Sequence, residues 1–225
     1  MCSSDLVLHT SPPAQRGGTP VRDAVRFIAR DRRLRSVFVT FTVVGTFAFN
    51  YSVSLLAISN SRFGERTLFG VLLASTGFGS MVGSLLTAAR ERVTTRWFLG
   101  NGLLLGLAGL GLSWSPTWWM ALVWSVPVGM GGAAFIAGMN AIVQQEAPSD
   151  MRGRLLALGA VAFLGSTPVG APVTGWVADH VASEWSLAYG SVTTLVAVSV
   201  AIVLRRRSAG HEWSADASAR HTVVP

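Results

Sequence analysis

The side chains that could do chemistry in this chain are few and scattered. The histidines are His9, His180, His211 and His221, and the single cysteine is Cys2. A metal site needs several such groups at close spacing, and intramembrane hydrolysis needs an activated nucleophile or a pair of aspartates. The sequence contains neither arrangement, and it has no glycine-rich phosphate loop. We therefore expect no catalytic residue, no metal and no cofactor.

Polar residues gather instead in one turn, at 140–154. This turn carries two adjacent glutamines, the acidic residues Glu146 and Asp150, and the arginines Arg152 and Arg154. Apolar runs precede and follow it. The following run has about 24 residues, whereas about 20 suffice to cross a bilayer core. The turn therefore indicates a loop between two transmembrane helices.

Apolar runs of this kind recur along the chain, without an acidic or basic residue in any interior. A soluble helix shows a polar face with a period near 3.6, and these runs do not. We predict an all-α membrane protein with six transmembrane helices. The runs lie at roughly 37–58, 68–88, 97–112, 118–143, 155–178 and 187–204.

Composition and charge agree with a membrane protein. Charged residues make up 13% of the chain, against about 25% in soluble domains, so the net charge of +7 does not indicate a nucleic-acid partner. With the first segment placed inside, 16 of the 18 arginines lie on that side. Cytoplasmic loops are enriched in arginine. We expect the plasma membrane of a bacterium, with both termini cytoplasmic.

The sequence divides into three parts. Residues 1–35 are a basic cytoplasmic lead-in, with an amphipathic helix over 21–35 that either lies near the membrane surface or binds anionic lipid. Residues 36–205 hold the six helices, and 206–225 are expected to be a disordered cytoplasmic tail. Residues 1–6 match the translation of a common sequencing adapter. We therefore expect this chain to be the C-terminal part of a longer protein.

Small residues and one proline predict how the helices pack. Gly79 and Gly83, and likewise Gly102 and Gly106, have the spacing that allows close helix contact in a membrane. Pro127 lies in the fourth run beside three glycines, which predicts a kink or hinge there.

The polar turn resembles the loop before the eleventh helix of major facilitator superfamily transporters. It is most similar to the branch of drug and siderophore exporters sometimes called transmembrane secretion effectors. The segment with Gly165, Gly170, Pro172 and Gly175 is similar to the packing segment of that helix. The resemblance implies the C-terminal six-helix half of a twelve-helix fold. The matching pattern is Asn140-x3-Gln144-Gln145-x2-Pro148-x3-Arg152-Gly153-Arg154.

The resemblance also implies which residues control the conformation. Segment 89–96 resembles the basic inner loop of the superfamily, although Thr87 or Ala88 stands where the family usually has an acidic residue. Its arginines either hold the inward gate or only set the topology. The expected gate and conformational residues are Arg90, Arg92, Arg96, Pro127, Arg152, Arg154, Gly170 and Pro172.

In the superfamily, the helices that match the first and fourth runs line the central cavity. This implies substrate contact by Phe47, Asn50, Tyr51 and Phe135, although all four also fit helix–helix packing. The implied function is alternating-access export of a bulky, amphipathic small molecule, together with a missing N-terminal six-helix half. The alternative is a natural six-span protein that pairs with a second copy or acts as an assembly factor without transport.

Overall fold

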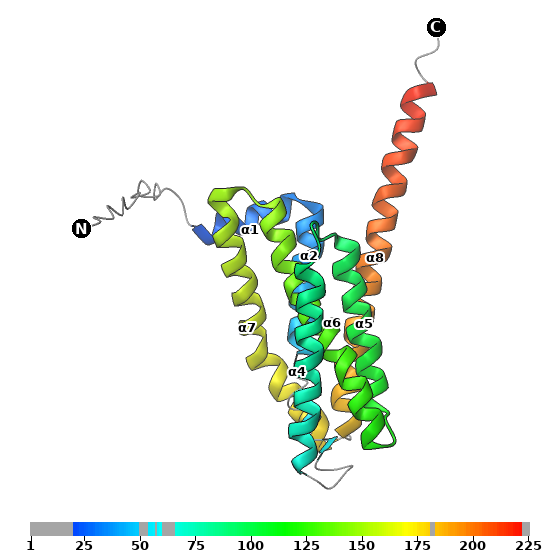
Figure 1. Cartoon of the computed structure of the whole chain (residues 1–225). Helices are drawn as coiled ribbons and strands as arrows, with labels where there is room; N and C mark the ends of the chain where they lie inside the picture. Colours follow the sequence, from blue (N-terminus) through cyan, green and yellow to red (C-terminus); the bar gives the residue numbers. More distant parts are fainter. Residues whose placement is uncertain (1–19, 50–53, 57, 60–65, 181–182, 222–225) are drawn as a thin grey trace, which may run out of the picture.

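The computed structural model describes residues 20–49, 54–56, 58–59, 66–180 and 183–221, so Asn50 and Tyr51 lie outside the described residues. Within these ranges the chain forms helices and turns and no strand, which confirms the all-α prediction there (Figure 1). The long helices are α1 (Pro20–Arg30), α2 (Arg32–Ala48), α4 (Arg66–Ala88), α5 (Thr95–Ser113), α6 (Trp118–Glu146), α7 (Ser149–His180) and α8 (Ser183–His221).

The lead-in helix ends earlier than its sequence pattern predicts. α1 stops at Arg30, and α2 begins at Arg32 instead of near residue 37. The carboxylate of Asp31 causes the break, because it accepts hydrogen bonds from the backbone N–H groups of Arg33 at 2.8 Å and Leu34 at 3.2 Å. An aspartate at the N-cap accepts hydrogen bonds from the first backbone N–H groups of the new helix. In a continuous helix these N–H groups would instead donate to carbonyls of the preceding turn. The single predicted helix over 21–35 is therefore wrong.

Protein covers part of the apolar side of α1, whereas Val21 and Val25 remain exposed. Ala24 is 1% exposed and Ile28 is 8% exposed, and α1 packs against α2 and α7. The helix thus docks on the bundle, while its arginines remain at the surface.

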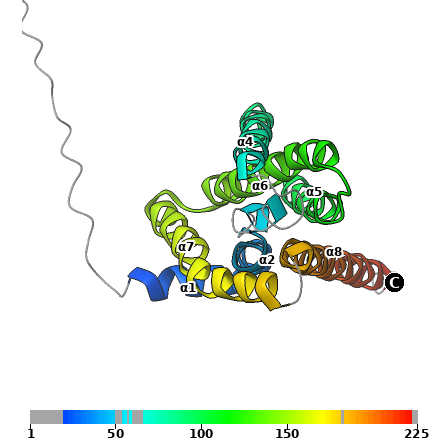
Figure 2. The same cartoon turned by 90° about the horizontal axis from the view of Figure 1, so that it is seen from below.

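The remaining helices form a bundle in which α2 lies between α7 and α8 (Figure 2). α5 packs between α6 and α8, and α4 packs chiefly on α6. The largest fully buried side chains include Phe98, Phe135 and Met139.

Both predicted small-residue pairs lie where helices touch. A Cβ atom at Gly79 or Gly83 would collide with a backbone carbonyl of α6, at Val126 or Met130 respectively. A Cβ at Gly102 would lie 2.8 Å from Val198, and one at Gly106 would lie 2.7 Å from Leu195, both on α8. The packing prediction is confirmed, because the backbone of α6 leaves no room for a Cβ at Gly79 or Gly83, and side chains of α8 pack directly on Gly102 and Gly106.

Three helices are long and apolar enough to cross a membrane among the residues described: Thr67–Ala88, Trp118–Glu146 and Trp185–Arg207. α2, α5 and α7 coincide with three other predicted runs. The full count of six spans stays a prediction.

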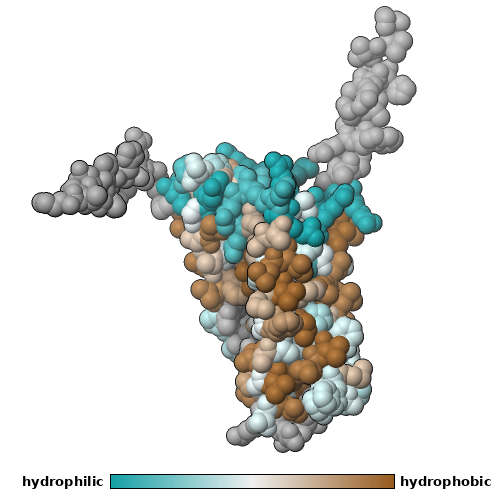
Figure 3. All heavy atoms as spheres, viewed as in Figure 1, coloured by the Kyte–Doolittle hydropathy of each residue, from teal (hydrophilic) through white to brown (hydrophobic). Residues whose placement is uncertain are grey.

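The two ends of the bundle differ chemically. Hydrophilic residues gather at the end that carries α1, and apolar residues cover the body below it (Figure 3). At the other end Trp114 packs edge-on against Trp185, with ring centroids 6.1 Å apart. Exposed tryptophans are typical of a membrane–water interface.

α8 does not end with its apolar part. It continues as a helix to His221, into the segment 206–225 that is predicted from the sequence to be a disordered tail. The reason is that extending an existing helix avoids the cost of a new nucleus.

Candidate functional site

An ion pair and a hydrogen bond at the hydrophilic end join three helices that are distant in the sequence. Nη1 of Arg33 on α2 lies 2.7 Å from Oε1 of Glu146, the last residue of α6. Nε of the same guanidinium donates to Oγ1 of Thr95, the first residue of α5, at 2.8 Å. One side chain therefore holds together the ends of α2, α5 and α6. We call Arg33, Thr95 and Glu146 the Arg33 network.

The basic loop between α4 and α5 is fixed by a second set of contacts. The guanidinium of Arg90 lies over the ring of Trp97, 3.6 Å from its centroid, a distance that suits a cation–π interaction. The indole N–H of Trp97 donates to Oγ1 of Thr87 at 3.2 Å. Thr87 therefore connects the end of α4 to the start of α5, on either side of this loop.

The side chain of Gln145 clamps the same loop to α6. In the amide orientation that satisfies both of its polar atoms, it donates to the carbonyl of Val93 and accepts from the N–H of Val93, each at 3.1 Å. The loop thus has two attachments, one to α4 and α5 and one to α6.

The predicted gate arginines have different surroundings. Arg90 lies on Trp97, Arg92 is exposed, and Arg96 lines a groove between α5 and α8. Arg152 donates to the carbonyl of Ala147 at 3.5 Å, and Arg154 is exposed. The structure therefore does not gather these arginines into one cluster, and their gating role stays a prediction.

Aromatic rings fill the middle of the bundle. Phe135 on α6 is fully buried and stacks on Phe98 and Phe41, with centroid distances of 4.2 Å and 5.8 Å. Phe41 also stacks on Phe163 of α7 at 5.6 Å, and Phe163 meets Phe49 at 4.9 Å. These rings link α2, α5, α6 and α7. Among the predicted substrate contacts, Phe135 thus belongs to the packed core of this conformation.

Phe47 lies apart from those rings. It packs edge-on against Tyr189 of α8, with centroids 5.7 Å apart. The hydroxyl of Tyr189 is buried and has no hydrogen-bond partner among the described residues. Phe47 and Phe135 are therefore not brought together, and Asn50 and Tyr51 lie outside the described residues.

The predicted hinge and packing residues lie in long helices. Pro127 is inside α6, which continues through it, and a Cβ on nearby Gly129 would collide with the carbonyl of Thr76 on α4. This glycine therefore serves close packing. In α7, Gly170 is buried and its carbonyl accepts from Oγ1 of Thr174 at 2.8 Å, while Pro172 is exposed.

Sequence reasoning did not assign Arg33, Thr95 or Tyr189 to a site. The usable signals were Asp31, which marks a helix start just before Arg33, and Glu146, an acidic residue in a turn followed by arginines. Among the described residues, no group of three His, Cys, Asp or Glu side chains could hold a metal ion.

Comparison with known proteins identifies the family of this chain. The model of the Major Facilitator Superfamily matches residues 8–224, nearly all of the 225-residue chain. No curated protein and no solved structure matches significantly. The helical bundle with membrane-length apolar helices agrees with the family match. The chain therefore belongs to the Major Facilitator Superfamily, a family of membrane transporters.

Proposed function

We propose that this chain is the C-terminal six-helix half of an exporter for drug-like or siderophore-like molecules. Family membership supplies transport, and the resemblance of the turn at 140–154 supports the exporter branch. In this proposal the half works by alternating access, and its hydrophilic end faces the cytoplasm of a bacterium.

The proposed cargo is inferred from the aromatic rings that contact one another through the bundle. Phe49 and Phe163 form a partly exposed apolar surface between α2 and α7, backed by the buried ring of Phe41, and the spans have no charged residue in their interiors. Such a surface favours a bulky, largely apolar molecule over an ion. Phe47, Asn50 and Tyr51 contribute further contacts in this proposal. Phe135 reaches the cargo only when its stack on Phe41 opens.

Two helices of the bundle carry surfaces suited to a further set of helices. On α4, a Cβ at Gly70 or Gly77 would meet no atom within 4 Å, and the same holds for Gly165 and Gly175 on α7. Exposed glycines allow close approach of another membrane helix. In our proposal the N-terminal half of the transporter covers these surfaces.

In this proposal the Arg33 network supports the inward gate by holding this half together at its cytoplasmic end. It connects the ends of α2, α5 and α6, and Arg90, Arg92, Arg96, Arg152 and Arg154 lie in the adjoining loops and helix ends. Because α2, α5 and α6 belong to the same half, the network would hold their ends together as one unit while the two halves rock.

The test is efflux by the protein encoded by the complete upstream reading frame. Cells that make it should accumulate less of a fluorescent amphipathic dye than cells with an empty vector. Asn50→Ala should reduce efflux while the amount in the membrane stays equal. Val123→Ala, at an exposed position of α6 (69% exposed), is the matched control. Equal efflux for the Asn50 variant and wild type would remove Asn50 from the binding site.

The competing function is a six-span protein that pairs with a second copy or aids assembly. The open glycine surfaces of α4 and α7 would then contact the same surfaces of another copy. The mass of the detergent-purified 225-residue chain separates the two proposals. A stable dimer, together with an upstream stop codon, would favour the competing function.

A further inference from the structure

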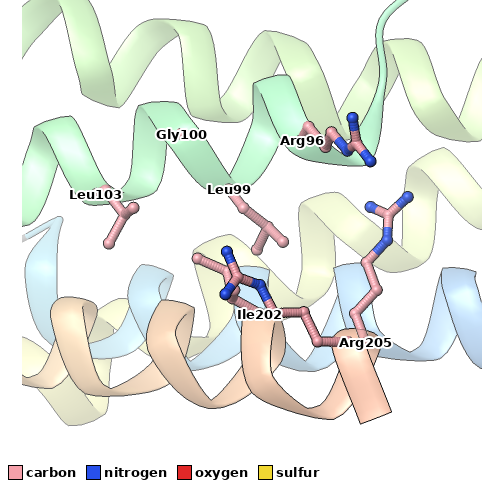
Figure 4. A pocket seen from close by; sticks show the side chains of 7 residues that line it. Arg96, Leu99, Gly100, Leu103, Ile202 and Arg205 are labelled. Carbon is pink, nitrogen blue, oxygen red and sulfur yellow. The ribbon is translucent and has the colours of Figure 1, made fainter. Parts of the chain in front are cut away.

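A groove of about 370 Å³ lies between α5 and α8 at the hydrophilic end. Figure 4 shows Arg96 and Arg205 at one end of the groove and Leu103 at the other, with Leu99 and Ile202 between them. Arg206 also lines the groove. The groove thus combines three cationic side chains with an apolar floor.

The positive charge of the groove is not balanced locally. No acidic residue lines it, and none of its three arginines makes an ion pair within the described part of the chain. Arg33 and Arg96 both repel Arg205, while Glu146 attracts it, but Glu146 is already paired with Arg33. A bound anion would therefore relieve repulsion among these arginines.

The place of the groove in the bundle identifies the kind of anion. Arg205 and Arg206 end the membrane-length helix Trp185–Arg207, where lipid headgroups lie. Leu107, further along α5 from Leu103, is 58% exposed and extends the apolar floor toward the body of the bundle. Basic pockets between membrane helices on the cytoplasmic side bind acidic headgroups.

We propose that this groove binds an anionic phospholipid, with its phosphate at Arg96, Arg205 and Arg206 and an acyl chain along Leu99, Leu103 and Ile202. The site requires only that the chain lies in a membrane, and it is separate from the cargo surface of α2 and α7. Free phosphate shares the headgroup chemistry, but it would leave the apolar floor uncovered.

Gly100 offers a sharp test, because it lines the groove and a Cβ there would meet no atom within 4 Å. Gly100→Leu should fill the groove without a clash, and Gly100→Ala should leave it open. Both substitutions replace glycine, which has a low helix propensity, by a better helix former. Any difference in lipid binding between the two variants is therefore due to the filling of the groove. Arg205→Gln and Arg206→Gln test the charge, and Arg26→Gln, at an exposed position of α1, controls for the loss of one arginine elsewhere.

The measurement is native mass spectrometry of the full chain in detergent with added dioleoyl phosphatidylglycerol or dioleoyl phosphatidylcholine. We expect preferential retention of phosphatidylglycerol by wild type, Gly100→Ala and Arg26→Gln. Gly100→Leu should lose it, and each groove arginine variant should bind it about fivefold more weakly. Excess inorganic phosphate should not displace it.

Several results would overturn the proposal. Equal retention of the two lipids, or equal retention by the Gly100→Leu and Gly100→Ala proteins, would exclude a lipid site in the groove. Displacement by inorganic phosphate would identify a phosphate site instead. If the complete protein binds the lipid but does not export the dye, only the proposed export function would be contradicted.

Discussion

Arg33 and Glu146 form an ion pair with a nitrogen–oxygen distance of 2.7 Å, although Arg33 lies in the first turn of α2 and Glu146 is the last residue of α6. Thr95 accepts a hydrogen bond from the same guanidinium. The start of the bundle and its middle are thus joined at the hydrophilic end by one side chain. A contact of this kind links the orientation of α2 to that of α5 and α6.

The strength of this ion pair can be measured with a double-mutant cycle. Because the side chain of Arg33 is 45% exposed, solvent screens the pair, and we expect a coupling energy of only about 0.5 kcal/mol between Arg33→Gln and Glu146→Gln. Thermal unfolding of the purified protein in detergent measures it. The coupling should shrink at high salt. Arg32→Gln, at an exposed neighbouring position, should show no coupling to Glu146→Gln.

The contact between α4 and α6 predicts a contrast between two glycines of one helix. Gly83→Ala should destabilise the protein by about 1–3 kcal/mol, because the new methyl group collides with the backbone of Met130. Gly77→Ala meets open space and should be neutral or stabilise by up to about 1 kcal/mol. Thermal unfolding of both variants in detergent provides the comparison. Equal stability would show that the two helices lie farther apart than the structure has them.

The Gln145 clamp predicts how readily the basic loop opens. Gln145→Leu removes both hydrogen bonds to Val93, so the loop should open more often and trypsin should cleave after Arg92 several-fold faster. Gln144 is an exposed neighbour, and Gln144→Leu is the matched control. The cleavage rates of the two variants are compared by gel electrophoresis or mass spectrometry. If both variants are cut at the same rate, the clamp does not hold the loop.

Substitution of Tyr189 should affect the stability of the protein and its transport activity in opposite directions. Its hydroxyl is buried without a partner among the described residues, so Tyr189→Phe should stabilise the protein by about 1 kcal/mol. Tyr189→Leu also removes the ring that packs on Phe47 and should destabilise it. If the hydroxyl serves the cargo, the phenylalanine variant of the complete transporter should export less while being more stable. Lower stability of that variant would reveal a partner outside the described residues.

The sequence was sufficient for features that repeat or act locally. Apolar runs predict the helices, and the spacing of Gly79 and Gly83 predicts their contact with α6, because both follow from hydropathy and helix geometry. The break at Asp31 was missed because a capping carboxylate overrides an amphipathic period that looks continuous. The Arg33 network was missed because its three members meet only once the helices are packed. The stack of Phe135 between Phe98 and Phe41 likewise depends on three helices at once.

The packing of α4 chiefly on α6, and not on its sequence neighbour α5, has a consequence for synthesis. α4 enters the bilayer before the helix that holds it has been made, and at ordinary translation rates the interval lasts several seconds. During that interval its glycines Gly79 and Gly83 face lipid, and no backbone of α6 yet covers them. The bundle therefore closes out of sequence order, because the part of α6 that covers these glycines, at Val126 and Met130, is made after α5.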